Sequence, residues 1–377
     1  MNVALVYDRV NKFGGAERVL LALHEIWPEA PLYTAVYDSG GAPWANVFRV
    51  RPSFLQHVPF AKKHHEFFPW LTPLAFETFQ FDSFDVVVSV TSAEAKNIIT
   101  KPDTLHICYC LTPTRYLWSG YEGYQEIPGM GLLSQPARMA SRWFGPHLRK
   151  WDFFASSRPD YYIAISQKVS ERIKTYYKRD VAEVIYPPVD LSLFQKPSSK
   201  TIEHKTKDSY FLLVSRLVGY KRVDIVIDAF NVLGWPLVVI GDGWARDSLM
   251  GKAKGNIHFI SAHLTDTELV GYYQNCRAFV FAGDEDFGLV AVEAQACGKP
   301  VIAFRTSGIA EVVLEGKTGL LFDTQTAESL TRVLEQFGKM TFSSHVCRDN
   351  AARFDITIFK NKMKQMVERL YKEERNS

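Results

Sequence analysis

The chain has 377 residues, of which 47% are hydrophobic and 23% charged, so it is a folded globular protein long enough for two domains. Its 44 basic and 41 acidic residues leave a net charge of +3, which is too even for a protein that binds nucleic acid through phosphates. We find neither an apolar run of about eighteen residues nor a signal peptide, and five irregularly spaced cysteines suit a reducing compartment. We therefore expect a cytoplasmic protein.

Short apolar runs alternate with amphipathic helical stretches, and this alternation occurs twice along the chain. Such a pattern is typical of a parallel sheet covered by helices on both faces, so the predicted fold is α/β with two doubly wound, Rossmann-like lobes. In the first series, the expected strands are 3–8, 85–89, 105–110 and 161–166, with a helix at 16–27. In the second series, the expected strands are 210–215, 237–240, 257–260, 278–281, 301–304 and 319–322.

A proline-containing segment, Tyr186 to Asp190, and the polar stretch Lys196 to Ser209 after it suit a linker between the two series. We place an N-terminal domain at residues 1–195 and a C-terminal domain at 196–353. The last segment, 354–377, is expected to form a helix that packs back on the first domain. Ligands of this fold class bind at the carboxyl ends of the strands, so we expect a cleft between the lobes and functional residues in the loops after strands.

Two cations follow the first strand of the second series. Arg216 stands at the strand end, and Lys221 stands at the start of the next helix, where its charge opposes the helix dipole. A guanidinium and an ammonium together suit a diphosphate, whose charge would compensate theirs. Two solvated surface cations are the alternative. In the first series, Gly14 and Gly15 precede a helix, and their bare amides suit an anion or a sugar hydroxyl unless they only form a tight turn.

An acidic loop, Asp284 to Asp286, lies between a strand and a helix in the second series. Glu293 lies within that helix among alanine and valine, where a carboxylate needs hydrogen-bond donors, and a ribose diol would supply them. Glu285, at the tip of the loop, suits the hydroxyls of a sugar. The amides at the start of the helix suit a phosphate and belong to Phe287, Gly288 and Leu289.

Several segments, taken in order, resemble the retaining nucleotide-sugar glycosyltransferases of family 4, which have the GT-B fold. The last of them looks like that family's motif of two glutamates separated by seven residues. The segments are Gly14 to Val19, Pro73 to Glu77, Thr112 to Tyr116, Ile185 to Asp190, Ser215 to Asp224, Val239 to Gly243, and Glu285 to Glu293.

The resemblance implies that the protein transfers a hexosyl unit from a nucleoside diphosphate sugar to a saccharide or polyprenyl-linked acceptor, with retention at the anomeric carbon and no metal or other cofactor. It assigns Arg216 and Lys221 to the donor diphosphate, Glu285 to the transferred sugar and Glu293 to the ribose. Arg216, Lys221 and Glu285 would then be the catalytic residues. The loop of Gly14 and Gly15 would lie near the phosphate and the acceptor. Similarity to mannosyltransferases of surface polysaccharide assembly favours GDP-mannose, with UDP-sugars next.

One residue departs from the family pattern. Many relatives carry a histidine just before the Thr-Pro that corresponds to Thr112 and Pro113, and here this position is Leu111. A non-catalytic protein that binds nucleotide sugars is therefore an alternative. Another alternative is to interpret Asp284 to Asp286 as an Asp-x-Asp metal site, which would imply a metal-dependent glycosyltransferase of a different fold.

Two stretches that mix cations with aromatic residues, Lys62 to Leu71 and Arg142 to Trp151, suit contact with an anionic membrane surface. A polyprenyl-linked acceptor would be presented there, at the inner face of the membrane. Packing of these aromatic residues into the first lobe is the alternative.

Overall fold

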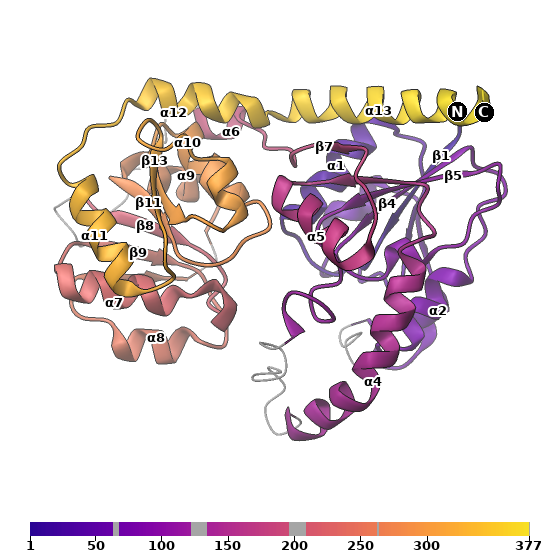
Figure 1. Ribbon diagram of the computed structural model, residues 1–377, viewed down its shortest axis with the longest axis horizontal. Helices are drawn as coiled ribbons and strands as arrows, with labels where there is room; N and C mark the ends of the chain where they lie inside the picture. The colour runs from indigo at the N-terminus through magenta and orange to yellow at the C-terminus, as the bar shows by residue number, and fades with distance from the viewer. Residues whose placement is uncertain (63–67, 122–133, 196–208, 262–263, 377) are drawn as a thin grey trace. The chain divides into compact units, whose positions relative to one another are not determined.

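The computed structural model describes residues 1–62, 68–121, 134–195, 209–261 and 264–376 (Figure 1). The chain forms two compact units. Unit 1 consists of Met1–Pro188 and Phe359–Ser377, and unit 2 is Val189–Ile358. Each unit contains a parallel β-sheet flanked by helices, which confirms the predicted fold of two Rossmann-like lobes.

The sheet of unit 1 has seven parallel strands in the order β3-β2-β1-β4-β5-β6-β7. Its central strands β1, β4 and β5 are buried along their whole length, as expected for a sheet with both faces covered. The strands are β1 (Val3–Tyr7), β2 (Leu32–Thr34), β3 (Val50–Pro52), β4 (Val86–Thr91), β5 (Leu105–Cys110), β6 (Tyr161–Ala164) and β7 (Glu183–Val184). The described α-helices are α1 (Gly15–Ile26), α2 (Leu71–Glu77), α4 (Ser134–Ala155), α5 (Gln167–Tyr177) and most of α13 (Ile356–Asn376).

Helix α13 returns the chain to unit 1. Its apolar side chains recur at helical spacing and are buried, among them Phe359, Met363 and Val367. The Phe359 ring lies 5.7 Å from that of Tyr109 on β5. Lys360 forms an ion pair of 2.7 Å with Glu25 on α1. The C-terminal segment is therefore part of the core of unit 1.

The sheet of unit 2 has six parallel strands in the order β10-β9-β8-β11-β12-β13. This strand order places β8 and β11 side by side at the centre, so the loops after these two strands share one edge of the sheet. The strands are β8 (Phe211–Val214), β9 (Leu237–Ile240), β10 (Ile257–Ile260), β11 (Ala278–Phe281), β12 (Val301–Phe304) and β13 (Gly319–Phe322). The described α-helices are α6 (Ser192–Gln195), α7 (Val223–Leu233), α8 (Arg246–Lys252), α9 (Asp266–Asn275), α10 (Leu289–Ala296), α11 (Ala327–Phe337) and α12 (Ser344–Ala351).

Among the helices of the described residues, we find none with the length and hydrophobicity that a transmembrane segment requires.

Candidate donor site

Two cations gather around Tyr220 at the carboxyl edge of the unit 2 sheet. After β8 the chain forms a short 3₁₀ turn, Gly219–Lys221, before α7 begins. The Arg216 Nη2 atom donates a hydrogen bond of 2.5 Å to the Tyr220 hydroxyl. The Lys221 Nζ atom lies 5.0 Å from the centre of the Tyr220 ring. The structure therefore brings Arg216 and Lys221 to one aromatic side chain, with Arg216 exposed and Lys221 buried.

The Lys221 ammonium forms an ion pair with the carboxylate of Glu285, in the loop after β11. Lys221 is only 8% exposed, so its charge depends on this partner. Removing one member of a buried ion pair leaves the other as an uncompensated charge. Lys221, which was expected to contact phosphate, and Glu285, which was expected to contact the sugar, therefore neutralise each other's charge.

The loop that carries Glu285 is held by contacts from both sides. The Ser307 hydroxyl accepts a hydrogen bond of 3.0 Å from the Glu285 amide, and the Gly308 amide donates one of 2.8 Å to the Glu285 carbonyl. On the other side, a Cβ atom at Gly283 would lie 2.7 Å from the Lys221 carbonyl oxygen. Only glycine allows this approach, so Gly283 fixes the distance between the acidic loop and the Lys221 turn.

The start of α10 depends on Gly288. Its φ of +96° lies in the region that favours glycine, and a Cβ atom there would lie 2.2 Å from Cγ1 of Ile309. The preceding residue, Phe287, is buried, and its ring lies 5.4 Å from that of Phe354. Leu289 is the first residue of the helix. Because the first amides of a helix have no partner within it, those that follow Gly288 form a positive end beside the acidic loop.

Glu293 lies in α10 and is 3% exposed. Its Oε2 atom accepts a hydrogen bond of 2.9 Å from the hydroxyl of Tyr273, a fully buried residue of α9. The need for a donor, which the sequence analysis inferred from the apolar surroundings, is thus met in part within unit 2. Its contact with a ribose stays a prediction.

The two glycines of the first loop belong to unit 1. Gly14 caps α1 in an extended conformation, with φ of −172°, and Gly15 is the first residue of the helix. A Cβ atom at Gly14 would lie 3.2 Å from the Glu17 carboxylate, so the loop has little room for a side chain. Leu111, also in unit 1, is half-buried, and its amide donates a hydrogen bond of 2.8 Å to the Thr91 carbonyl.

Sequence reasoning missed the residues that hold the site together. Tyr220 links both cations, Tyr273 holds Glu293, and Ser307 fixes the Glu285 loop. Tyr220 lies next to Lys221 in the sequence. An aromatic residue beside a candidate phosphate ligand could therefore have indicated that Tyr220 belongs to the site. Ser307 and Tyr273 gave none, because each comes from a distant element and neither stands in a recognisable motif.

The unit that carries these residues is similar to known proteins. Residues 194–354, all in unit 2, match the family of glycosyl transferases group 1. An uncharacterized glycosyltransferase of Methanocaldococcus jannaschii is 31% identical over 188 residues, which is 48% of this chain and 51% of the relative. The D-rhamnosyltransferase WbpZ of Pseudomonas aeruginosa is 28% identical over 185 residues, 46% of each chain. This chain spans about half the length of the curated relatives it matches.

Among solved structures, Anabaena HepE in complex with UDP and glucose is similar over 98% of this chain and 99% of its own, with a TM-score of 0.70 and 18% identity. That likeness, together with the two parallel-sheet units, shows that the chain has the GT-B fold. The different fold implied by the Asp-x-Asp alternative is therefore wrong for this chain.

Proposed function

We propose that the protein is a retaining glycosyltransferase that moves a hexosyl unit, mannosyl in the first instance, from a nucleoside diphosphate sugar to a saccharide or polyprenyl-linked acceptor in surface polysaccharide assembly. The observation that carries the proposal is the Lys221–Glu285 pair beside Arg216, within the part of the chain that matches the glycosyltransferase family. Cations, a carboxylate and a helix start at one sheet edge suit a phosphate joined to a sugar.

In the proposed reaction, the bond between the anomeric carbon and the donor phosphate oxygen breaks, and a bond to the acceptor oxygen forms on the same face of the sugar. The acceptor hydroxyl proton passes to the departing phosphate. Negative charge grows on that phosphate as the bond breaks, so preformed cations near it lower the barrier. We assign this task to Arg216, Lys221 and the amides that follow Gly288.

Glu285 has two tasks in this proposal. Its carboxylate pairs with the buried ammonium of Lys221 and orients it, and its remaining hydrogen-bonding capacity is available to hydroxyls of the transferred sugar. Glu293, beside Tyr273, is assigned to the ribose, and Gly14 with Gly15 to the phosphate and acceptor side. No metal is assigned to the reaction.

Two observations bear on the donor. One relative is a D-rhamnosyltransferase, and D-rhamnose is a 6-deoxy sugar with the configuration of mannose. The structural neighbour HepE binds UDP and glucose. We propose GDP-mannose as the donor, and a thermal-shift screen with GDP-mannose, UDP-glucose, UDP-galactose and UDP-N-acetylglucosamine tests it. A true donor stabilises the protein by mass action.

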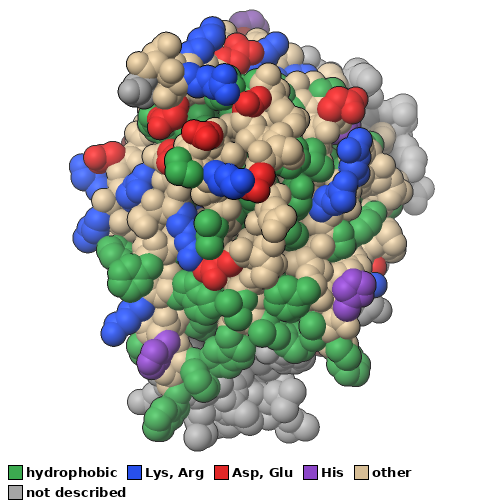
Figure 2. Space-filling model, turned by 90° about the vertical axis from the view of Figure 1, so that its right-hand side faces the viewer, with side chains coloured by type: hydrophobic (Ala, Val, Ile, Leu, Met, Phe, Trp, Pro, Cys, Tyr) green, Lys and Arg blue, Asp and Glu red, His purple; other side chains and the backbone are tan. Residues whose placement is uncertain are grey.

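We propose that the protein acts at a membrane surface. Figure 2 shows hydrophobic side chains gathered over the lower part of one face of unit 1. In α4, Trp143 and Phe154 are 76% and 70% exposed, and Lys150 is also exposed. The Phe144 ring contacts that of Trp70, just before α2, with centres 4.2 Å apart. Residues 63–67 and the side chains of 134–142, which complete the two stretches singled out in the sequence, lie outside the description.

The ion pair gives the decisive test of transfer. We expect Lys221→Ala and Glu285→Ala each to lower kcat by two or more orders of magnitude, while the protein stays folded. The Lys252–Asp228 pair is the matched control, since it joins exposed residues of the same unit at 3.1 Å, and Lys252→Ala should leave turnover within about twofold.

Near-normal turnover in either site variant would overturn these assignments. A wild-type protein that is stabilised by a nucleotide sugar but transfers nothing to lipid-linked acceptors would support the non-catalytic alternative, which Leu111 motivates.

A further inference from the structure

Three loops at the carboxyl edge of the unit 1 sheet bring together charged and phenolic side chains that the proposed function leaves unused. Arg9 follows β1, Glu94 follows β4, and Tyr116 follows β5. These strands are direct neighbours in the order β1-β4-β5, so the loops after them share one edge of the sheet.

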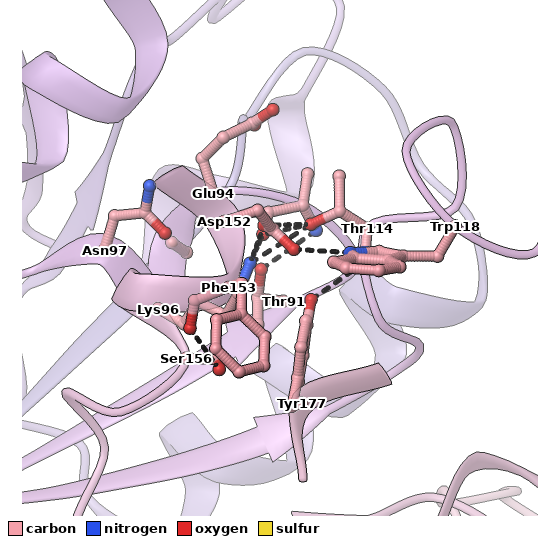
Figure 3. A network of polar contacts seen from close by, with 12 residues as sticks. Thr91, Glu94, Lys96, Asn97, Thr114, Trp118, Asp152, Phe153, Ser156 and Tyr177 are labelled. Carbon is pink, nitrogen blue, oxygen red and sulfur yellow. Dashed lines mark hydrogen bonds and ion pairs between the residues drawn. The ribbon is translucent and has the colours of Figure 1, made fainter. Parts of the chain in front are cut away.

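Glu94 is a buried carboxylate, with the residue 6% exposed. The Tyr116 hydroxyl donates a hydrogen bond to it. Burial raises the pKa of the Glu94 carboxyl, and the charge of Arg9 opposes that rise. In Figure 3 its carboxylate points away from the neighbouring cluster around Lys96 and Asp152. The Glu94 carboxylate therefore takes no part in the hydrogen bonds of Lys96 and Asp152 that hold its loop.

Arg9 is half-buried, and no hydrogen bond or ion pair joins its guanidinium to another residue of the described part of the chain. Burial lowers the pKa of Arg9, but the nearby charges of Glu94 and Asp8 outweigh that effect, so the pKa is raised. A second phenol–carboxylate pair lies near it, in which the Tyr7 hydroxyl donates to Glu17 at 2.6 Å. Arg9 thus has five N–H donors available close to the carboxylates of Glu94 and Asp8.

Charged side chains with several hydrogen bonds each hold the loop that carries Glu94 at both of its ends. Asp8 accepts hydrogen bonds from the Thr91 hydroxyl at 2.7 Å and the Ala95 amide at 2.8 Å. The Lys96 ammonium donates to Asp152 at 2.5 Å, as Figure 3 shows. Buried charges that stabilise a fold are normally satisfied in this way. Arg9 and Glu94 contrast with them, since both keep hydrogen-bonding capacity beyond their contacts with the described residues.

Two further features of the third loop indicate a ligand at this edge. Thr112 is 4% exposed, and its hydroxyl is buried without a hydrogen-bond partner among the described residues. Leu111, beside it, supplies only apolar surface, so polar contacts here must come from neighbouring loops. The amide of Leu111 bonds the Thr91 carbonyl, which places the second and third loops directly together.

We propose that Arg9 and Glu94 bind hydroxyl groups of a neutral saccharide acceptor at this edge of unit 1, with Tyr116 positioning Glu94. A sugar hydroxyl both donates and accepts, so it fits a carboxylate acceptor beside a guanidinium donor. The positive charge of Arg9 is matched by the nearby charges of Glu94 and Asp8, which disfavours a phosphate or carboxylate on the bound sugar. The assignment rests on the proposed glycosyltransferase function and names the acceptor side of that reaction.

The test compares Glu94→Gln and Arg9→Met with matched exposed controls, Glu29→Gln and Arg49→Met, in the full-length protein. A panel of octyl α- and β-glycosides of mannose, glucose, galactose and N-acetylglucosamine serves as acceptor probes. Direct binding is measured by saturation-transfer NMR without donor, and kcat and KM are measured for acceptor and donor separately. Losing one charge-assisted hydrogen bond should lower acceptor kcat/KM by roughly 10- to 100-fold.

We expect Glu94→Gln and Arg9→Met to weaken binding of the glycoside and to leave donor KM and nucleotide-induced thermal stabilisation within about twofold. Tyr116→Phe should raise acceptor KM by less than Glu94→Gln does, and it serves as the second variant if Glu94→Gln does not fold. Site variants that bind the glycosides as tightly as the controls, or a wild type that binds none of them, would overturn the inference. A wild type that binds the glycosides through Glu94 but no nucleotide sugar would instead count against the proposed function.

Discussion

Removing one member of the buried ion pair between Lys96 and Asp152 should strongly destabilise unit 1. The two side chains are 1% and 4% exposed, and their Nζ and Oδ1 atoms are 2.5 Å apart. Lys96 also donates to the Ala93 carbonyl at 2.6 Å, while Asp152 accepts from Thr114 and Trp118, each at 2.7 Å. The pair therefore joins the loop after β4, the loop after β5 and helix α4.

We expect Lys96→Met to lower the free energy of unfolding by about 3–5 kcal/mol, because it leaves the Asp152 carboxylate buried without its cation. The double variant Lys96→Met with Asp152→Leu should be less destabilised than Lys96→Met alone, since it removes the stranded charge as well. Such non-additivity is the mark of a direct pair.

Guanidinium-induced unfolding, followed by tryptophan fluorescence, measures these differences, and Trp118 lies in the network itself. The surface pair Lys101–Asp82 is the control in the same unit, since it spans a similar 2.7 Å but its side chains are 61% and 57% exposed. Lys101→Met should cost no more than about 1 kcal/mol. Equal losses for Lys96→Met and Lys101→Met would refute the reasoning from burial.

Two further predictions concern acid and lipid. Burial lowers the pKa of His106 to about 3, so the folded state excludes a proton that the unfolded state takes up below pH of about 6.5. The free energy of unfolding should fall by up to about 1.4 kcal/mol per pH unit as the pH drops below about 6.5. His106→Gln should reduce this pH dependence, measured by urea unfolding at pH 7 and pH 5. The exposed Trp143 and Phe154 of α4 should promote binding to vesicles of phosphatidylglycerol and phosphatidylcholine. Replacing both with serine should reduce co-sedimentation at least fivefold, and unchanged co-sedimentation would contradict the membrane proposal.

Most strands of unit 2, and β5 of unit 1, could be predicted closely from the sequence. The runs at 105–110, 237–240, 257–260, 278–281, 301–304 and 319–322 match β5 and β9 to β13 at both ends. These segments are short, mainly apolar runs, which is the signal of a buried parallel strand. The edge strand β10 is predicted as closely, although three of its four residues are only half-buried. Strands β2, β3 and β7 were missed because they have three, three and two residues, too few to show any period.

Some helices, like some strands, could be predicted from the sequence and others could not. Thr265 and Glu268 form a capping box at the start of α9, with both reciprocal hydrogen bonds present, and a threonine three residues before a glutamate is a signal that sequence alone can offer. In contrast, α4 was not separated from its aromatic surroundings, because Pro146 lies inside it and charged and aromatic residues are mixed along it.

The candidate sites show why residue types are easier to predict than contacts. Lys221 and Glu285 were each singled out, but their ion pair joins positions 64 residues apart. What brings them together is the close backbone approach at Gly283, and nothing in the local sequence marks that glycine as a contact point with the Lys221 turn. Pairings of this kind arise from sheet order, which a single sequence fixes only through the whole fold.

The buried charges at the carboxyl edge of the unit 1 sheet fall into two kinds. One kind stabilises the fold, and we assign the other to acceptor binding. Asp8, Lys96 and Asp152 use their hydrogen-bonding capacity within unit 1, so substituting them should act first on stability. Arg9 and Glu94 lie next to these groups but keep capacity beyond their contacts in the described part of the chain. Because the satisfied charges already hold the loops, the folded state gains little from Arg9 and Glu94, and their substitution should change acceptor binding more than unfolding.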